Sequence, residues 1–250
     1  MILKSYTMRY LVLSDIHSNI EALTATVRKA KDVGYDRALC CGDLVGYGPN
    51  PAEVMDLLDE LGTTSIRGNH DRVVSGLDEP THFNVAARHA VDWTREHLAE
   101  PYRQRLAALT VGPLQITETM RLVHGSAKDE DEYVVTQNDA LVNLALPGPA
   151  ITFFGHTHEP GVFTRTVRWS PNYEADGSAR LRVPTDKVLV NPGSIGQPRD
   201  GDSRASFLVW DDDESILEFH RAEYSIETTQ ARMREAKLPE FLINRLAVGR

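Results

Sequence analysis

The stretch Arg9-Tyr-Leu-Val-Leu-Ser-Asp-Ile-His17 places a short apolar run directly before two polar side chains, Asp15 and His17. Beyond it, apolar residues recur at the spacing of one helix face, at Ile20, Leu23, Val27 and Ala30. Ser18 and Glu21 have the spacing of a capping box, which is typical of a helix start. We therefore expect a buried strand, a polar turn and then an amphipathic helix.

The same pattern recurs twice along the first half of the chain. Arg37–Cys41 runs into Gly42-Asp43, and a helix is expected from Pro51 to Gly62. Thr64–Arg67 then runs into Gly68-Asn-His-Asp71. Three such units in succession predict a largely parallel sheet covered by helices, an α/β fold. Ligands of these sheets bind beyond the carboxyl ends of the strands, where each polar cluster is expected to lie.

The rest of the chain alternates less regularly. Helices are expected at Phe83–Leu109, Asn138–Leu146, Ser225–Lys237 and Glu240–Ala247. Strands are expected at Leu114–Glu118, Met120–Val123, Ala150–Phe154, Lys187–Val190, Ser206–Trp210 and Ser215–Phe219. Val162–Trp169 and Ala179–Val183 flank Asp176-Gly177, which predicts a hairpin. No linker or repeat divides the chain, so we expect one domain over residues 1–250, with residues 1–7 as an extension.

Composition narrows the classes of function. The 250 residues carry a formal net charge of −9 and show no Lys/Arg run, which argues against general nucleic-acid binding. No apolar stretch is long enough to span a membrane, and a secretory signal pattern is lacking. Cys40 and Cys41 are neighbours on a strand and point to opposite faces, so we expect two buried thiols of a cytoplasmic protein. Nothing in the sequence indicates an oligomeric state.

Five polar clusters, each directly after an expected strand, carry the candidate chemistry. A lone histidine is more often an ordinary residue than a ligand, so the joint pattern matters more than any single motif. The clusters are Asp15-x-His17, Gly42-Asp43, Gly68-Asn-His-Asp71, His124-Gly125 and Gly155-His-Thr-His158. Carboxylate, imidazole and amide oxygen suit Mn²⁺, Fe²⁺ and Zn²⁺. Two such ions roughly 3.5–4 Å apart clamp a phosphoryl group and activate a water molecule.

In this order and with these residue types, the five clusters resemble the calcineurin-like metallophosphoesterase family. The resemblance implies a four-layer α-β-β-α sandwich with two mixed β-sheets. It also implies two divalent metal ions, with Mn as the first expectation and Fe, Zn or Ni as alternatives. Carried over residue by residue, the ligands are Asp15, His17 and His158 for one ion, Asn69, His124 and His156 for the other, and Asp43 between them.

The resemblance also implies a mechanism. His70 would donate the proton to the leaving group, Asp71 would orient His70, and a metal-bound hydroxide would be the nucleophile. The segment Gly42–Pro49 lacks the arginine with which the protein Ser/Thr phosphatase branch grips phosphate, having Gly46 and Tyr47 there instead. The chain is therefore more similar to the small bacterial and archaeal phosphodiesterase branch.

Four further side chains are candidates for a place beside the substrate. The stretch Asn191-Pro-Gly-Ser-Ile-Gly-Gln-Pro-Arg199 is either a tight turn or a rim that brings Gln197 and Arg199 to the substrate. Arg67 either touches phosphate or ends its strand. His82 either lines the cleft or is an ordinary surface residue.

These observations favour a hydrolase that cleaves a phosphodiester or phosphomonoester of a small phosphorylated substrate, with a nucleotide among the candidates. Two alternatives remain. A catalytically silent scaffold of the same fold is one, although the chain keeps every named ligand position. A nuclease acting on polymers is the other, and the acidic charge balance argues against it.

Overall fold

A computed structural model describes residues 8–183 and 186–250, so the extension expected at residues 1–7 lies outside the described residues. The first sheet has six strands in the order β3-β2-β1-β11-β12-β9. Their bounds are β1 Arg9–Leu13, β2 Arg37–Cys40, β3 Thr64–Ser65, β9 Ser178–Arg182, β11 Ala205–Asp211 and β12 Ile216–Ala222. Strands β1, β2 and β3 are parallel, as the repeated units predict, whereas β11, β12 and β9 add antiparallel partners.

The second sheet also has six strands, in the order β4-β5-β6-β10-β7-β8. Their bounds are β4 Leu114–Gln115, β5 Met120–Leu122, β6 Ile151–Phe153, β7 Gly161–Phe163, β8 Arg168–Trp169 and β10 Val188–Asn191. Strands β5, β6 and β10 are parallel, whereas β4 and β5 here, like β11 and β12 in the first sheet, are antiparallel neighbours. Both sheets are therefore mixed, as expected.

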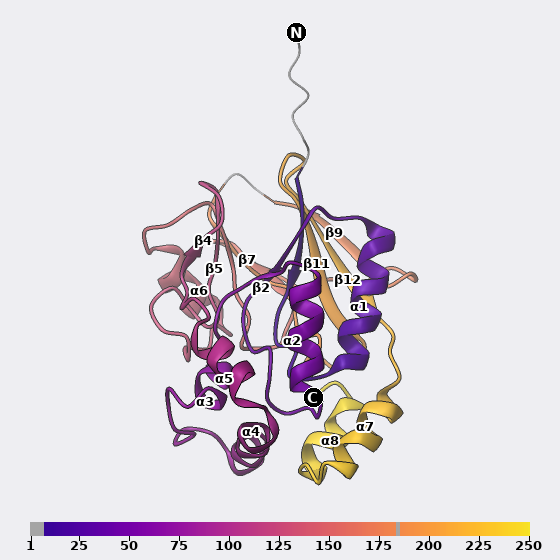
Figure 1. Cartoon of the computed structure of the whole chain (residues 1–250). Helices are drawn as coiled ribbons and strands as arrows, with labels where there is room; N and C mark the ends of the chain where they lie inside the picture. The colour runs from indigo at the N-terminus through magenta and orange to yellow at the C-terminus, as the bar shows by residue number, and fades with distance from the viewer. Residues whose placement is uncertain (1–7, 184–185) are drawn as a thin grey trace.

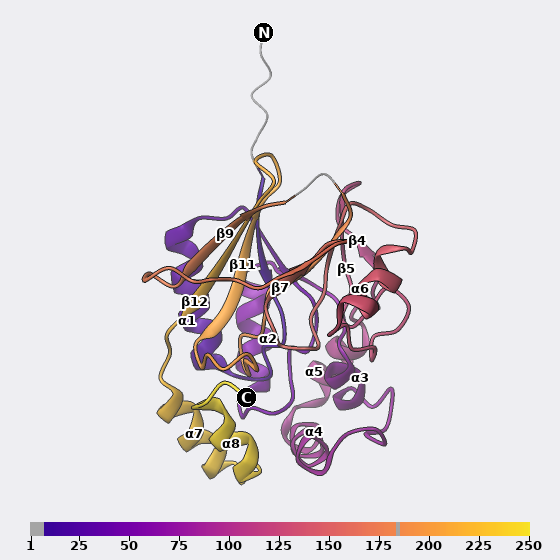
Figure 2. The same ribbon diagram turned by 180° about the vertical axis from the view of Figure 1, so that it is seen from behind.

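Helices cover the outer faces of both sheets, which gives the four layers (Figure 1). Helices α1 (Ile20–Val33) and α2 (Pro51–Glu60) lie on the first sheet, and α6 (Gln137–Leu144) lies on the second. The remaining helices gather at one end of the sandwich (Figure 2). These are α3 Asn69–Val74, α4 Val85–His97, α5 Glu100–Ala107, α7 Ile226–Glu235 and α8 Glu240–Leu246. The predicted α-β-β-α sandwich is confirmed.

Side-chain alternation along the central strands builds two cores at once. In β1, Leu11 and Leu13 pack under the outer helices, while Tyr10 and Val12 pack between the sheets. Cys40 and Cys41 divide in the same way, and both are free buried thiols. A strand buried on both faces reads as a continuous apolar run, which explains why the stretch before Asp15 is so informative.

Two sequence-based expectations about the elements are wrong. The helix expected over Phe83–Leu109 is broken into α4 and α5 at Leu98-Ala99, because Pro101 lies in the first turn of α5 and cannot continue a helix from α4. The capping box expected from Ser18 is replaced by Asn19, whose side chain accepts a hydrogen bond from the backbone N–H of Ala22.

The hairpin expected around Asp176-Gly177 is also wrong. Strand β7 pairs with β8 in the second sheet, whereas β9 pairs with β12 in the first. The Asp176-Gly177 turn is real, with Gly177 at φ +76°, but it starts β9 as the chain crosses from one sheet to the other. A turn motif specifies local geometry and does not choose the strand's partner. In the described residues, no helix combines the length and apolar character that a membrane span requires.

Candidate metal centre

The five polar clusters meet at one end of the sandwich, although they come from both sheets. Asp15 and His17 follow β1, Asp43 follows β2, and Asn69 opens α3 just beyond β3. The second sheet contributes the remaining three histidines. His124 follows β5, and His156 and His158 follow β6. The carboxyl ends of the parallel strands in both sheets thus meet at one buried place, and the polar clusters lie beyond these ends as the sequence predicts.

Seven side chains form two overlapping groups there. Asp15, His17, Asp43 and His158 form one group, in which one potential ligand atom from each residue lies within 4.8 Å of the others. Asp43, His124 and His156 form a second group by the same measure, so Asp43 belongs to both. Asn69 extends the second group, because its Oδ1 atom lies 3.1 Å from His124 Nε2.

Three imidazoles are held by the ring nitrogen that faces away from the centre. The Nδ1 atoms of His17, His124 and His158 lie 3.1, 2.8 and 2.7 Å from the backbone oxygens of Val45, Cys41 and Gln197. A carbonyl only accepts, so each Nδ1 carries a hydrogen, and Nε2 is the ring nitrogen that faces the centre. The Nε2 atoms lie close together around Asp43. Nε2 of His17 lies 3.1 Å from Nε2 of His158 and 3.6 Å from Asp43 Oδ2, and Nε2 of His124 lies 3.4 Å from Asp43 Oδ2. Ring nitrogens that converge in this way fit a cation between them once His124 has given up its Nε2 proton.

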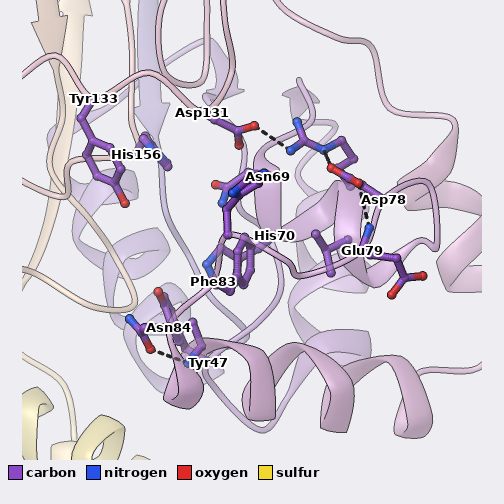
Figure 3. Close-up of a pocket in the computed structure, with 14 residues that line it drawn as sticks. Tyr47, Asn69, His70, Asp78, Glu79, Phe83, Asn84, Asp131, Tyr133 and His156 are labelled. Atoms are coloured by element: carbon purple, nitrogen blue, oxygen red, sulfur yellow. Dashed lines mark hydrogen bonds and ion pairs between the residues drawn. The ribbon is translucent and has the colours of Figure 1, made fainter.

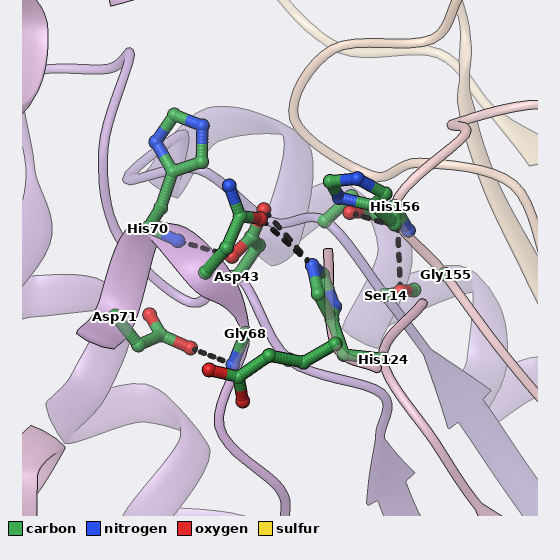
Figure 4. Close-up of polar contacts among 12 residues, drawn as sticks. Ser14, Asp43, Gly68, His70, Asp71, His124, Gly155 and His156 are labelled. Atoms are coloured by element: carbon green, nitrogen blue, oxygen red, sulfur yellow. Dashed lines mark hydrogen bonds and ion pairs between the residues drawn. The ribbon is translucent and has the colours of Figure 1, made fainter. Parts of the chain in front are cut away.

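Both carboxylates are positioned by hydrogen bonds from the surrounding loops. Asp15 accepts a hydrogen bond from Ser14 Oγ at 2.7 Å and from the backbone N–H of His156 at 3.1 Å. Asp43 Oδ1 accepts the backbone N–H of His70 at 2.9 Å, which leaves Oδ2 facing the histidines (Figure 4). Burial is nearly complete, with Asp15 at 0% and Asp43 at 1% exposure. Two buried carboxylates demand compensating positive charge.

The backbone around the centre is unusual. Most of the described non-glycine residues with positive φ lie at this end of the fold: Asp15, His17, Ser18, Asp43, Tyr47, His156 and His158. Their φ values run from 50° to 66°, in the left-handed region that costs of order 1 kcal/mol or more per non-glycine residue. Such a concentration is typical of a functional site, because the scaffold must hold these turns against their local preference.

Glycines beside the carboxylates allow the close approach. A Cβ atom at Gly68 would overlap Asp43 Oδ1, and one at Gly155 would overlap Ser14 Oγ. Gly68 has φ −101°, which any residue adopts, so the requirement there is space and not backbone conformation. The glycines of the Gly-Asn-His-Asp and Gly-His-Thr-His clusters are thus explained by packing.

The charges in the metal-free protein follow from burial and mutual interaction. Burial raises the pKa of Asp15 to about 7. Burial disfavours a charged His124, but the neighbouring Asp43 carboxylate outweighs it and raises the pKa of His124 to about 10. Burial lowers the pKa of His17 and His158 well below the usual value. The site therefore has neutral imidazoles that can bind a cation directly. It also has a proton shared by Asp43 and His124 that a cation would displace.

The Asp71 side chain does not orient the His70 ring, contrary to the expectation from the resemblance. The Asp71 carboxylate accepts backbone N–H groups of Leu44, Val45 and Gly68 at 2.9–3.1 Å. It thereby ties the loop after Asp43 to the start of α3. The His70 ring packs against His17 and Phe83, and its Nδ1 atom is buried without a hydrogen-bond partner among the described residues. Burial lowers the pKa of His70 to about 4.

The stretch Asn191–Arg199 contacts the loops that carry the metal-ligand candidates. Ser194 Oγ donates to the backbone oxygen of Asp15 at 2.7 Å, and Asn191 Nδ2 donates to Gly155 O at 3.0 Å. Arg199 Nη2 donates to Gln197 Oε1 at 3.0 Å and lies 3.4 Å from Tyr47 Oη. The sequence singled out this stretch for its turn and its last residues. The structural contributions of Asn191 and Ser194 were missed, because single hydrogen-bonding side chains leave no periodic signal.

The other side chains raised by the sequence lie in different surroundings. Arg67 pairs with Glu130 at 3.1 Å, and Tyr47 packs its ring against His17 and His70 with centroids 4.5 and 4.4 Å away. His82 lines a cavity of about 200 Å³. Asn69 and His156 line the same cavity, which therefore adjoins the centre (Figure 3).

Comparisons with known proteins agree on one family. The model of the calcineurin-like phosphoesterase superfamily domain matches residues 8–215. An uncharacterized protein of Methanocaldococcus jannaschii is 34% identical over 245 residues, which are 96% of this chain and 97% of that protein. The crystal structure of a metallophosphoesterase from Sphaerobacter thermophilus has a TM-score of 0.86 at 38% identity, covering 98% of this chain and 100% of that chain. A hypothetical protein from Pyrococcus horikoshii OT3 shares the fold, with a TM-score of 0.79 at 22% identity over 97% of this chain and 99% of that chain.

The packing around Gly68 leads to a first prediction. Gly68→Ala should weaken Mn²⁺ binding about 10- to 100-fold, because the added Cβ must displace the Asp43 carboxylate. Gly62→Ala is the control, because a Cβ at Gly62 meets no atom within 4 Å. The positive φ of +62° at this position means that the substitution lowers the stability of the fold without touching the centre. Calorimetric titration with Mn²⁺ measures both. Unchanged affinity in Gly68→Ala would show that the close approach at Asp43 does not matter for the cation.

The protonation of the centre leads to a second prediction. Because a cation must displace the protons held by Asp15 (pKa about 7) and His124 (pKa about 10), Mn²⁺ affinity should rise from pH 6 to pH 8. More protons should be released at pH 6, where Asp15 is still protonated, than at pH 8. Titrations in buffers of different ionisation enthalpy measure the release. Affinity and proton release that do not vary with pH would contradict this account.

Proposed function

Because the chain belongs to the calcineurin-like phosphoesterase superfamily and is a metal-dependent phosphoesterase, we propose that it hydrolyses small phosphomonoesters or phosphodiesters at a two-ion centre built around Asp43. The observation that carries this proposal is the membership of Asp43 in both ligand groups. Asp43 Oδ2 lies 3.6 Å from His17 Nε2 in the first group and 3.4 Å from His124 Nε2 in the second, so this carboxylate could serve cations in both half-sites.

The proposed ligands divide into two half-sites. Asp15, His17 and His158 hold one divalent ion with Asp43, and Asn69, His124 and His156 hold the other. Support comes from the Nδ1 hydrogen bonds that turn Nε2 inward, and from the buried Nε2 of His156, which has no hydrogen-bond partner among the described residues. The mixed N and O donor set suits Mn²⁺, our first choice, as well as Fe, Zn and Ni. When bound, the ions supply positive field at the phosphoryl oxygens and lower the pKa of a water molecule to yield the nucleophile.

The residues around this centre position substrate and protons. His70 is proposed as the general acid, since its ring lies beside His17 and Tyr47 and carries an unpartnered buried Nδ1. Burial keeps the pKa of the free ring at about 4, so His70 must take up a proton from solvent when the anionic substrate binds, since a nearby negative charge favours the imidazolium. Asp71 supports His70 through the backbone of Gly68 and the loop after Asp43, and not through the ring.

Substrate contact is proposed chiefly for Arg199. Its charge reaches the centre, because it contributes to the lowered pKa values of His158 and His70, and its Nε is buried without a hydrogen-bond partner among the described residues. Gln197 fixes the Arg199 guanidinium and, through its backbone oxygen, His158. Arg67 is proposed as a more distant contributor, since Glu130 holds its guanidinium.

The role of His70 leads to a third prediction. His70→Ala should lower kcat about 10²- to 10⁴-fold on an alkyl phosphate ester, whose leaving group needs a proton. The loss should be much smaller on p-nitrophenyl phosphate, because that leaving group departs as an anion. Steady-state assays with Mn²⁺ compare the two substrates.

His89→Ala is the matched control, because His89 is an exposed histidine on α4 away from the centre. It should leave both rates unchanged. Equal losses on both esters in His70→Ala would assign His70 a role in binding or in structure. No Mn²⁺-dependent turnover of either ester by the native chain would contradict the proposed function itself.

A further inference from the structure

The cavity beside the metal ligands differs in character from the centre itself. It has a volume of about 200 Å³, and Asn69, His70 and His156 form its inner edge. A group joined to a phosphate at the centre therefore has a space in which to lie. The residues that line the rest of the cavity indicate what kind of chemical group it can bind (Figure 3).

Two aromatic rings lie next to the inner edge. The Tyr133 ring lies on His156, with centroids 3.9 Å apart, and the Phe83 ring lies on His70, with centroids 4.7 Å apart. Tyr133 is 53% exposed although it is large and partly apolar. An exposed aromatic face beside a catalytic centre is typical of a binding surface for another flat group.

On the opposite wall, the Arg72 guanidinium is already surrounded by carboxylates and is not available to a second phosphate. The Arg72 guanidinium lies between three carboxylates, with Nε 3.1 Å from Asp78, Nη2 2.7 Å from Asp131, and Nη1 in contact with Glu130. Nη1 and Nη2 donate hydrogen bonds to Glu130 and Asp131, whereas Nε is within ion-pair distance of Asp78 without forming a hydrogen bond among the described residues, so three carboxylates surround this one positive charge. Glu79, the remaining carboxylate on this wall, lies 3.5 Å from Arg95. This wall fits a neutral group and gives no counter-charge to a polyphosphate chain.

The same ion pairs fix the spacing of the cavity. Asp78 lies on the loop that carries Phe83, and Glu130 and Asp131 lie on the loop that carries Tyr133. Arg72 on α3 therefore ties both aromatic loops to the helix that begins with Asn69. A cavity of fixed width with aromatic walls favours a rigid planar occupant.

Hydrogen-bonding groups lie on the cavity's outer rim. Asn84 uses its Oδ1 to cap α4 by accepting the N–H of Ala87, which leaves its amide N–H groups for the cavity. His82 is exposed on the same rim. Donors at the edge of an aromatic slot suit the ring nitrogens and carbonyls of a nucleobase.

We propose that this cavity binds the base of a nucleoside monophosphate or of its ester, with Tyr133 as the stacking surface beside the metal ligands. The proposal deepens the proposed function and rests on it, because the phosphate of the same substrate occupies the centre. It names nucleoside monophosphates, and not polyphosphates, as the substrate class.

Binding of two probes that differ only in the base tests the proposal. We expect the full-length Mn²⁺-loaded chain to bind adenosine 5′-monophosphate about 10-fold more tightly than ribose 5-phosphate in calorimetric titrations, as base–aromatic stacking supplies that much. Tyr133→Leu should bring the two affinities close together, and Tyr133→Phe should preserve the difference. Phe241→Ala, which removes an exposed aromatic ring on α8, is the control and should change neither affinity.

Equal affinities of the native chain for the two probes would overturn the proposal. So would a preference for the nucleotide that survives in Tyr133→Leu. These outcomes are distinct from a failure of the proposed function, which would appear as absent Mn²⁺-dependent hydrolysis of any phosphoester. A base preference that depends on Tyr133 would support the subsite even then, because the binding assay needs no turnover.

Discussion

The Asp43 carboxylate is the group on which the rest of this site depends. It is almost completely buried, and the Nε2 atoms of His17 and His124 lie within 3.6 Å of its Oδ2. A buried anion is costly unless positive charge compensates it. Among the side chains themselves His124 takes this role, because the Asp43 carboxylate raises its pKa to about 10. The geometry of neutral imidazoles facing the same point indicates that cations take it in the working enzyme.

The fold supplies rigid ends for the residues that surround this carboxylate. Asp15 and Asp43 come from adjacent parallel strands of one sheet, and His124 and His156 come from adjacent parallel strands of the other. Their loops accept positive φ angles at several non-glycine positions, which local preferences oppose. The hydrogen bonds of Ser194 and Asp71 to neighbouring backbone hold these loops in place. The scaffold thus holds ligands that isolated loops would not.

Much of this arrangement was predictable from the sequence, for physical reasons. Strands buried on both faces, such as β1, read as apolar runs, and the polar clusters after them mark the carboxyl ends. The order and type of these clusters resemble the calcineurin-like family, and that resemblance implies the two mixed sheets. The partner of β9 was not predictable, because the Asp176-Gly177 turn specifies a local bend and not the sheet that the next strand joins.

Contacts between distant segments were the other limit. The expectation that Asp71 orients the His70 ring came from the resemblance, yet its carboxylate accepts backbone N–H groups instead. Tyr133 lies in an irregular loop, and only the folded chain brings it against His156. The metal-ligand motifs can therefore be recognised in the sequence, whereas the proposed base contact of Tyr133 depends on tertiary structure.

The number of metal ions per chain tests the central claim most directly. After equilibration with Mn²⁺ and removal of free metal, elemental analysis should find two ions per native chain. It should find one in His156→Ala, which removes a ligand of one half-site, and a loss from both half-sites in Asp43→Asn, with folding checked by circular dichroism. A single ion in the native chain, or two ions retained in Asp43→Asn, would contradict the bridged centre.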